Sequence, residues 1–392
     1  MAEKFFIYVG LSSPLIPAGK HGDWLIESVK MKLLIPISLV CFFSLSVAGE
    51  PGYKVVGKHE GSYAAFPNLF YVSGKPNELG LTVVDRDNVS HHDATGKEIR
   101  LSSDDCGETW VDAGTILQNP AYSSDAEVSD AKAVGWIETP KSKSGDLNAS
   151  LGKEGNRLFY AKGAVSRTSS DGKKNWVQKD IELPEHVLAM NYNLASKLFT
   201  KNGVGLVAIY IKPKVGDRDN VIYLRKDRDF GEWSFVDPKY NSNFVNMGFD
   251  ETALVQLPDG RILALMRPDP DDVGYLYYSL SQDQGLSWSV PIKSKMKGFP
   301  ASAIVLGNRV LVFTAVRYAK PMAIKSYLLD GESFNILDEK TLATTKGERL
   351  MDFGYPIVLS CGNNIVYSYY TNDGTRDVYS VVETRPKNFF LR

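Results

Sequence analysis

Ser103–Trp110 reads SDDCGETW, and Ser281–Trp288 reads SQDQGLSW. Both fit the pattern Ser-x-Asp-x-Gly-x-Thr/Ser-Trp, and degenerate copies end at Trp176 (SSDGKKNW) and Trp233 (KDRDFGEW). In such a pattern the aspartate and serine can hydrogen-bond a tight turn, and the glycine can take a left-handed backbone conformation. The tryptophan supplies a large apolar side chain for packing between sheets. The pattern therefore predicts a repeated β-hairpin whose turns have a structural role.

A longer repeat surrounds these turns and consists of an apolar strand, a Gly or Asn turn and a second apolar strand. Its period is roughly 50–65 residues, the size of one four-stranded propeller blade. The segment from Tyr53 (YKVVGKH) is expected to supply the last strand of the final unit and so close the ring. The sequence therefore predicts one all-β domain, a six-bladed β-propeller. Its units start near Phe66, Asp130, Asn193, Glu251, Phe299 and Tyr355.

The turn pattern resembles the Asp box, or BNR repeat, of the sialidase-like propellers, and the resemblance covers residues 53–392. It implies a six-bladed propeller with Asp-box hairpins. In that family the boxes lie on the outer hairpins, away from the active site. Related propellers include hydrolases, lyases and non-catalytic binders, so the boxes alone do not fix the chemistry. The resemblance gives no catalytic role to the box residues Asp105, Trp110, Asp283 and Trp288.

Strand direction decides which residues share a face of the predicted propeller. Successive strands run antiparallel, so the start of each innermost strand and the end of the next strand lie on the face opposite the boxes. We expect the substrate to bind on this face. The innermost strands bring Asp130, Asn193, Glu251 and Tyr355 to it, and the second strands bring Arg86, Arg267 and Arg317.

The three arginines favour an anionic ligand, because a guanidinium group offers paired donors to a carboxylate or sulfate. The alternative for each arginine is an ion pair within its own blade, for example Arg86 with Asp85 or Asp87. The net charge of -1 argues against a nucleic-acid partner, which normally requires a basic domain. We therefore expect the partner to be an acidic glycan or polysaccharide, contacted also by Asp130 and Asn193.

The C-terminal half of the chain resembles sialidases in the order and spacing of four residues: Glu251, Arg267, Arg317 and Tyr355. The resemblance implies that Tyr355 is the nucleophile and Glu251 its base, an exception among glycosidases. A neutral phenol attacks a centre beside a carboxylate more readily than an anion does. Arg267 and Arg317 would hold the carboxylate of a terminal sialic acid or similar sugar. The alternative for Tyr355, which precedes a proline, is a packing role.

The N-terminal half departs from the sialidase pattern. Sialidases carry an arginine in a Phe/Tyr-Arg-Ile-Pro motif, where this chain reads Ala64-Ala65-Phe66-Pro67. We expect Arg86 to replace that arginine from the adjacent strand. The position of the family's acid corresponds to Asp93, with Asp87 as the alternative. The missing arginine leaves the identity of the acidic sugar open.

Two neighbouring histidines, His91 and His92, support a second hypothesis, because histidine titrates near neutral pH. Some sialidase-like propellers are lyases that use a histidine and a tyrosine against uronic acids. The alternatives to a sialidase-type hydrolase are therefore a uronate lyase and a glycan-binding propeller without catalysis. We expect no metal, because His91, His92 and Asp93 are consecutive and cannot surround one ion unaided. We expect no cofactor either, because the sequence lacks a Gly-rich phosphate loop that opens a helix.

The N-terminal region resembles a secretory signal over residues 31–48, where Met31-Lys32 precedes an apolar run that ends in small residues. We expect residues 1–30 to be a start-site error and residues 49–392 to form the propeller; the alternative is an uncleaved membrane anchor. The mature protein is then secreted or periplasmic, a monomer and free of the membrane. Cys106 and Cys361 remain in it, either as a disulfide or as two buried thiols.

Overall fold

The computed structural model describes most of the chain beyond residue 51. The residues of the expected N-terminal extension and signal lie outside the described part. Only the backbone is described for strand residues 148–180 and 191–194 and for residue 212. The described residues are 52–72, 75, 77–86, 96–113, 148–154, 157–165, 174–181, 191–212, 219–227, 233–236, 248–269, 274–347, 349, 352–372 and 374–392.

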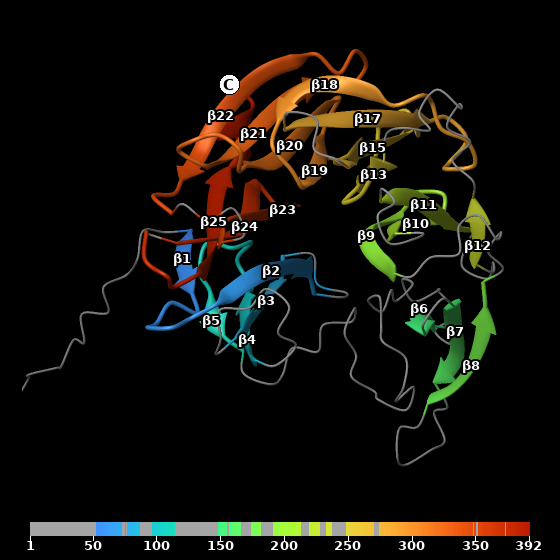
Figure 1. The fold of residues 1–392 in the computed structure, drawn as a ribbon, viewed down its shortest axis with the longest axis horizontal. Coiled ribbons are helices and arrows are strands. Elements are labelled where there is room, and N and C mark those ends of the chain that lie inside the picture. Colours follow the sequence, from blue (N-terminus) through green and yellow to red (C-terminus); the bar gives the residue numbers. More distant parts are fainter. Residues whose placement is uncertain are drawn as a thin grey trace, which may run out of the picture. The chain divides into compact units, whose positions relative to one another are not determined.

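Most of the described strands pair with their neighbours in sequence to form antiparallel sheets, and β1 (Tyr53–Val56) pairs instead with β25 (Tyr379–Pro386) (Figure 1). The first sheet contains β2 (Ala64–Tyr71), β3 (Leu79–Asp85), β4 (Lys97–Ser103) and β5 (Val111–Asp112). Next come β6 (Asn148–Glu154), β7 (Arg157–Val165) and β8 (Lys174–Asp180). The third sheet contains β9 (Asn191–Phe199), β10 (Gly205–Lys212), β11 (Asn220–Lys226) and β12 (Trp233–Val236).

The C-terminal half forms three more sheets and a short ribbon. The fourth sheet contains β14 (Ala253–Gln256), β15 (Ile262–Met266), β17 (Tyr275–Ser281) and β18 (Ile292–Lys297). The fifth contains β19 (Ala301–Leu306), β20 (Arg309–Val316), β21 (Ala323–Asp330) and β22 (Ile336–Thr344). The last contains β23 (Gly354–Cys361), β24 (Asn364–Thr371), β25 (Tyr379–Pro386) and β1 (Tyr53–Val56). The ribbon pairs β13 (Gly248–Phe249) with β16 (Pro268–Asp269), and α1 (Lys387–Phe390) is the short helix near the C-terminus.

The hydrophobic pattern of each of two strands agrees with its position in its sheet. β15 (ILALM) is apolar and buried throughout, as expected for a strand covered on both faces. β22 (ILDEKTLAT) alternates between half-buried and exposed residues for most of its length, as expected for the outermost strand of a sheet. The first strands of neighbouring sheets lie side by side in the order β9, β14, β19, β23 and β2. They form the inner wall of the propeller and position the site.

The prediction of an all-β propeller is confirmed, but the number of blades is corrected. The described residues form five complete four-stranded blades, not six. The expected second unit is a three-stranded sheet, β6–β8, and the residues just before it, 114–147, lie outside the described part of the chain. The expected closure is confirmed, because β1 pairs antiparallel with β25 and completes the last sheet.

Both Asp boxes occupy the turn between the third and fourth strands of a blade, as expected. Ser281 Oγ donates to Asp283 at 2.8 Å and accepts from the Gly285 amide at 2.7 Å. The Ser287 amide donates to Asp283 at 2.8 Å. The same bonds link Ser103, Asp105, Gly107 and Thr109. Trp288 stacks on Tyr223 of the neighbouring sheet, with ring centroids 4.4 Å apart, so the box joins two blades.

We expect Asp283→Ala to lower the free energy of unfolding by about 2 kcal/mol, because the turn loses its central acceptor. Activity should not change, because this turn lies at the opposite end of the sheet from the predicted site. Urea denaturation and a turnover assay check both statements. The matched control is Gln282→Ala, an exposed neighbour in the same box, with an effect of about 0.5 kcal/mol or less. Equal losses in the two variants would contradict the structural role of the aspartate.

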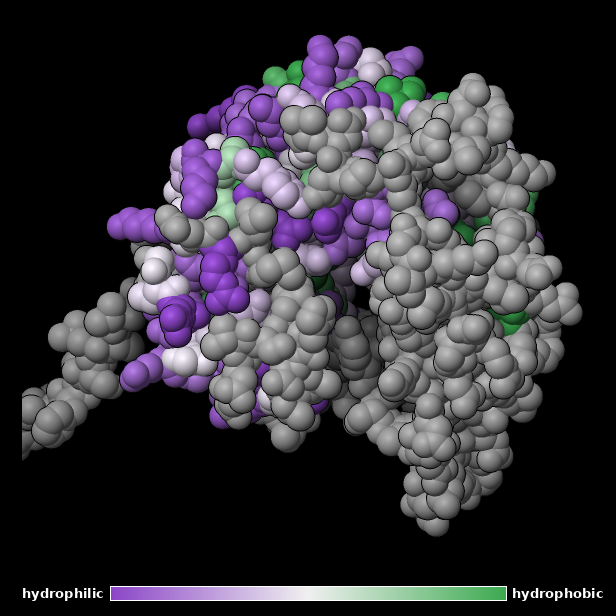
Figure 2. Space-filling model, in the orientation of Figure 1, coloured by the Kyte–Doolittle hydropathy of each residue, from purple (hydrophilic) through white to green (hydrophobic). Residues whose placement is uncertain are grey.

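Cys106 and Cys361 form a disulfide with Cα atoms 5.2 Å apart. Of the two alternatives, a disulfide or two buried thiols, the structure has the disulfide. The bond joins the first sheet to the last one. On the part of the described surface visible in Figure 2, hydrophobic residues form small separate patches among hydrophilic ones. No helix among the described residues has the length and hydropathy needed to span a membrane.

Candidate active site

The side chains of Tyr355 and Glu251 meet at the entries of two inner strands. Tyr355 is the second residue of β23, and Glu251 lies two residues before β14. The Tyr355 hydroxyl donates a hydrogen bond to Glu251 Oε1, across 104 residues of sequence. Strand direction predicted that both residues face one end of the sheets, and the structure brings their side chains together there.

The backbone at Tyr355 has an unusual conformation that it shares with Phe66. Their φ angles are 52° and 55°, in the left-handed region that bulky residues rarely adopt. A β-bulge interrupts the strand pairing at both positions, and a bulge redirects the side chain that it carries. The two rings meet edge to face with centroids 4.9 Å apart, and Tyr370 lies 5.9 Å from Tyr355. The strained entries of the first and last blades therefore build one aromatic wall.

Arg267 is the ionic partner of Glu251. Its Nη1 lies 2.8 Å from Glu251 Oε2, and its Nε lies 3.5 Å from Asp250 Oδ2. The guanidinium also lies 4.8 Å from the centroid of the Phe299 ring. The alternative considered for each arginine, an ion pair within its own blade, thus describes Arg267 in this structure.

Arg317 lies on the other side of Tyr355, with its guanidinium carbon 5.6 Å from the centroid of the Tyr355 ring. The residue is only 5% exposed, and its Nε has no hydrogen-bond partner among the described residues. Gly354 precedes Tyr355 with a φ of 138°, and a Cβ on it would lie 3.3 Å from the Ala315 Cβ. A buried guanidinium with an unused donor offers positive charge to an anionic ligand.

The pKa of Tyr355 is raised, chiefly because the phenol is buried and also because Glu251 is negatively charged beside it. The positive charge of Arg317 acts in the opposite direction. The phenol is therefore protonated at neutral pH and needs a base before it can attack as a nucleophile. The acceptor of its hydrogen bond, Glu251 Oε1, already has the position of such a base.

Arg86 follows β3 and lies beside the entry of the first blade. Its amide donates to the Tyr63 carbonyl at 3.2 Å, and its guanidinium carbon lies 5.7 Å from the centroid of the Phe66 ring. Burial and the charge of Asp352 raise the pKa of Tyr63 to about 12, whereas the charge of Arg86 lowers it. Arg86 thus adds positive charge next to the aromatic wall, where the sequence led us to expect it.

Of the other predicted site residues, the structure describes only the backbone of Asn193, and there β9 pairs it with Tyr210 of β10. The described residues contain no group of His, Cys, Asp and Glu side chains arranged to hold a metal ion. Five predicted residues lie outside the described part of the chain: Asp87, His91, His92, Asp93 and Asp130.

Asp250 is a second acidic residue at this site that our sequence reasoning missed. It is 8% exposed, and its Oδ1 has no hydrogen-bond partner among the described residues. Its burial raises its pKa to about 8; Arg267 opposes the shift and Glu251 adds to it. The signal was present in the sequence as two consecutive acidic residues at a strand entry, Asp250-Glu251.

This raised pKa predicts how stability changes with pH. Unfolded Asp250 ionises near its ordinary pKa of 3.8, but folded Asp250 holds its proton until about pH 8. Its contribution to the free energy of unfolding is therefore complete below the lower value and is lost as pH rises toward the upper one. We expect wild type to lose more stability than Asp250→Asn between about pH 5 and about pH 7.5 in urea denaturation. If the free energy of unfolding changed with pH by the same amount in wild type and in Asp250→Asn, the prediction would be contradicted.

A repeated aromatic-proline pair also went unused in the sequence reasoning. Phe66-Pro67, Phe299-Pro300 and Tyr355-Pro356 stand at the entries of the inner strands in the first, fifth and last blades. In the structure Phe66 contacts Tyr355, and Phe299 lies under Arg267. The repeat therefore marks aromatic residues that surround the Tyr355–Glu251 pair.

Comparisons with known proteins agree with this architecture. A family model described as a BNR repeat-like domain matches residues 147–368, more than half of the 392 residues. No curated protein matches the sequence.

Solved structures with the same fold share little sequence identity with this chain. A Dyadobacter fermentans protein of unknown function has a TM-score of 0.61 and 21% identity over 85% of this chain and 98% of its own. Trypanosoma rangeli sialidase, in complex with sialic acid, has a TM-score of 0.54 and 16% identity. The match covers 87% of this chain and 60% of the sialidase. Penicillium chrysogenum α-L-arabinanase, in complex with arabinobiose, has a TM-score of 0.52 and 11% identity. The match covers 86% of this chain and 98% of the arabinanase. Such low identities establish a common fold and nothing finer.

Proposed function

Because the chain belongs to the BNR repeat-like family, we propose that it is a glycoside hydrolase of the sialidase type that removes a terminal acidic sugar from a glycan. The observation that carries the proposal is the hydrogen bond from Tyr355 to Glu251 beside Arg267 and Arg317. The sialidase and the arabinanase of the same fold hold sugars in their structures, which supports a glycan as the ligand.

In the proposed first step the Tyr355 oxygen attacks the anomeric carbon of the bound sugar, and the bond from that carbon to the leaving oxygen breaks. Glu251 Oε1 accepts the phenolic proton along the existing hydrogen bond. Asp93 gives its proton to the leaving oxygen. The sugar is then covalently attached to Tyr355, and the rest of the glycan leaves as an alcohol.

In the second step a water molecule attacks the same carbon, and the bond to the Tyr355 oxygen breaks. Asp93, now a carboxylate, accepts a proton from the water, and Glu251 returns its proton to Tyr355. All three catalytic groups regain their initial states, and the configuration at the anomeric carbon is retained.

The carboxylate of the sugar is assigned to the arginines. Arg317 offers a buried donor that has no protein partner among the described residues. Arg267 is tied to Glu251 in the free protein, but this ion pair weakens once Glu251 takes the proton from Tyr355. Arg86 stands in for the arginine that the Ala64-Ala65-Phe66-Pro67 stretch lacks, and Asp130 and Asn193 complete the proposed contacts.

The test measures release from a fluorogenic α-sialoside by wild type and by the Glu251→Ala/Tyr355→Phe double variant. Release by wild type alone supports the full proposal. Release only from a fluorogenic α-L-arabinofuranoside would overturn the acidic substrate and keep hydrolysis. An unsaturated product from a uronate polysaccharide, seen by its near-ultraviolet absorbance, would replace hydrolysis by lyase chemistry. Ligand binding without turnover of any of these substrates would make the protein a glycan-binding propeller.

We also propose that the protein is exported. The disulfide supports export, because such bonds persist in oxidising compartments. The mass of the exported protein tests the predicted cleavage before Gly49, and an intact N-terminus would contradict it.

A further inference from the structure

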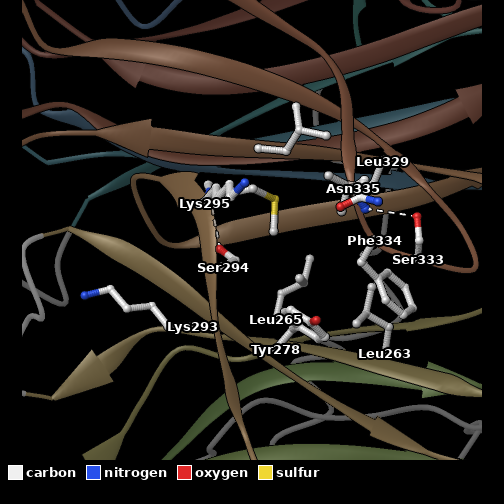
Figure 3. Close-up of a pocket in the computed structure, with 12 residues that line it drawn as sticks. Leu263, Leu265, Tyr278, Lys293, Ser294, Lys295, Leu329, Ser333, Phe334 and Asn335 are labelled. Carbon is white, nitrogen blue, oxygen red and sulfur yellow. Dashed lines mark hydrogen bonds between the residues drawn. The ribbon is translucent and has the colours of Figure 1, made fainter.

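A cavity of about 400 Å³ lies between the fourth and fifth sheets and shares no residue with the site around Tyr355. We call it the interblade pocket and define it by β18, Tyr278 and the turn between β21 and β22. Its floor consists of buried Leu265, Met296 and Leu329. In Figure 3, Lys293, Ser294 and Lys295 lie on one side, and Ser333, Phe334 and Asn335 lie on the other. The volume suits one small ligand.

Polar groups without partners line this pocket. The exposed Lys295 forms no ion pair with any described residue. The Tyr278 hydroxyl and the Asn335 side-chain amide likewise have no hydrogen-bond partner in the described part of the chain. A cation, a hydroxyl and an amide around an apolar floor are the few oriented polar groups that a small-molecule site requires.

Two aromatic rings are held rigidly in the wall of the pocket. Tyr278 and Phe334 have ring centroids 5.3 Å apart. Phe334 has a φ of 57°, and its amide donates to the Asp330 carbonyl at 3.0 Å. Arg261 lies 5.6 Å from the centroid of the Phe334 ring. A bulky residue held in the left-handed region is strained, and such strain clusters at binding sites.

A β-bulge shapes the opposite wall. The pairing of β17 with β18 shifts register between Tyr275 and Tyr277, and the Met296 amide donates to Ser294 Oγ at 3.1 Å. Bulges of this kind interrupt a strand edge beside binding sites. The bulged strand carries Lys293, Lys295 and Lys297 and no acidic residue, so this wall is positively charged. In Figure 3 the Lys293 ammonium points away from the other lining side chains, which leaves Lys295 as the cation of the pocket.

We propose that the interblade pocket binds one acidic sugar unit of a glycan, with its apolar ring face on Tyr278 and Phe334 and its carboxylate or sulfate at Lys295. An ammonium without an internal partner favours an anion over a neutral sugar. The hydroxyl of Tyr278 and the amide of Asn335 are partners for sugar hydroxyl groups. This inference does not depend on the proposed hydrolysis, because none of these residues belongs to the candidate active site.

The experiment titrates the full chain, carrying Tyr355→Phe so that no probe is consumed, with three probes. These are trigalacturonic acid for a carboxylate, a sulfated lactose for a sulfate and maltotriose as the neutral control. The protein carries ¹³C-methyl methionine, because Met296 lies in the floor of the pocket and reports binding there by its NMR signal. Met322 is buried outside the pocket, and its signal should not move.

We expect a charged probe to shift the Met296 signal and maltotriose to shift it little. Lys295→Gln should weaken this binding by about tenfold, which corresponds to the loss of one charge-assisted contact. Lys201→Gln, at an exposed lysine of the third sheet, is the matched control and should change nothing. The preferred probe decides between carboxylate and sulfate.

Three outcomes would overturn the proposal: no shift of the Met296 signal with either charged probe, equal shifts with maltotriose, or unchanged affinity in Lys295→Gln. Tyr278→Phe keeps the ring and the fold and removes only the hydroxyl. It should weaken binding by about threefold, so the test does not depend on one variant. Turnover of a small sialoside should be the same in Lys295→Gln as in wild type, which separates this pocket from the active site.

Discussion

Tyr355→Phe is expected to lower kcat by at least about 10³-fold while the protein folds and binds its substrate almost as before. The substitution removes one oxygen, which is the atom proposed to attack the sugar and the donor of the hydrogen bond to Glu251. The ring and its contacts with Phe66 and Tyr370 remain, so the aromatic wall is preserved. Steady-state kinetics with the active glycoside measures kcat and KM, and thermal unfolding confirms the fold.

The matched control for this prediction is Tyr370→Phe. Tyr370 is fully buried and stacks on Tyr355, and its oxygen is not the atom proposed to attack the sugar. We expect its loss of kcat to stay below about tenfold. If Tyr355→Phe retained wild-type kcat, the nucleophile would have to be another group. If both variants lost activity equally, the aromatic wall and not the Tyr355 oxygen would be responsible.

The second large effect concerns the disulfide between the first and last sheets. Replacing both cysteines, in Cys106→Ala/Cys361→Ala, is expected to lower the free energy of unfolding by about 2–5 kcal/mol. The two cysteines are 255 residues apart, so the bond restricts a very long segment of the unfolded chain. Urea denaturation of the wild type and the double variant measures the difference.

A reducing agent provides the control for this measurement. It should lower the free energy of unfolding of the wild type to about that of the double variant. The free energy of unfolding of the double variant should not change. A double variant as stable as the oxidised wild type would show that the sheets hold together without the bond. Activity of the folded double variant should be unaltered, since Cys106 and Cys361 lie at the turn ends of their sheets, away from Tyr355.

Much of the fold could be predicted from the sequence, because hydrogen bonds between residues close together in the sequence determine it. The pattern of Ser281, Asp283 and Gly285 specifies a turn through local hydrogen bonds, and the structure forms those bonds. Antiparallel pairing then fixes which strand ends share a face, and this placed Glu251 and Tyr355 together. The blade count was less secure, because no complete box marks the second unit and its described part has three strands.

The site was only partly readable, because its electrostatics depend on distances that a sequence does not contain. For Arg267 the sequence left two roles open, substrate binding and an ion pair within its own blade, and only the structure shows that it contacts both Glu251 and Asp250. The role of Phe66 depends on a left-handed backbone angle and a bulge, which the Phe-Pro pair alone does not reveal. The disulfide was undecided for the same reason, since only the folded chain brings the two cysteines together.

The pairing of β1 with β25 has a consequence for how the molecule is made. β1, the first strand of the described part of the chain, pairs there only with β25, which is synthesised near the end of the chain. Tyr53–Val56 therefore cannot form this pairing until Tyr379–Pro386 has emerged, and the last sheet stays incomplete until then. A chain that stops before Tyr379 loses more than its own end, because its opening strand is left without a partner as well.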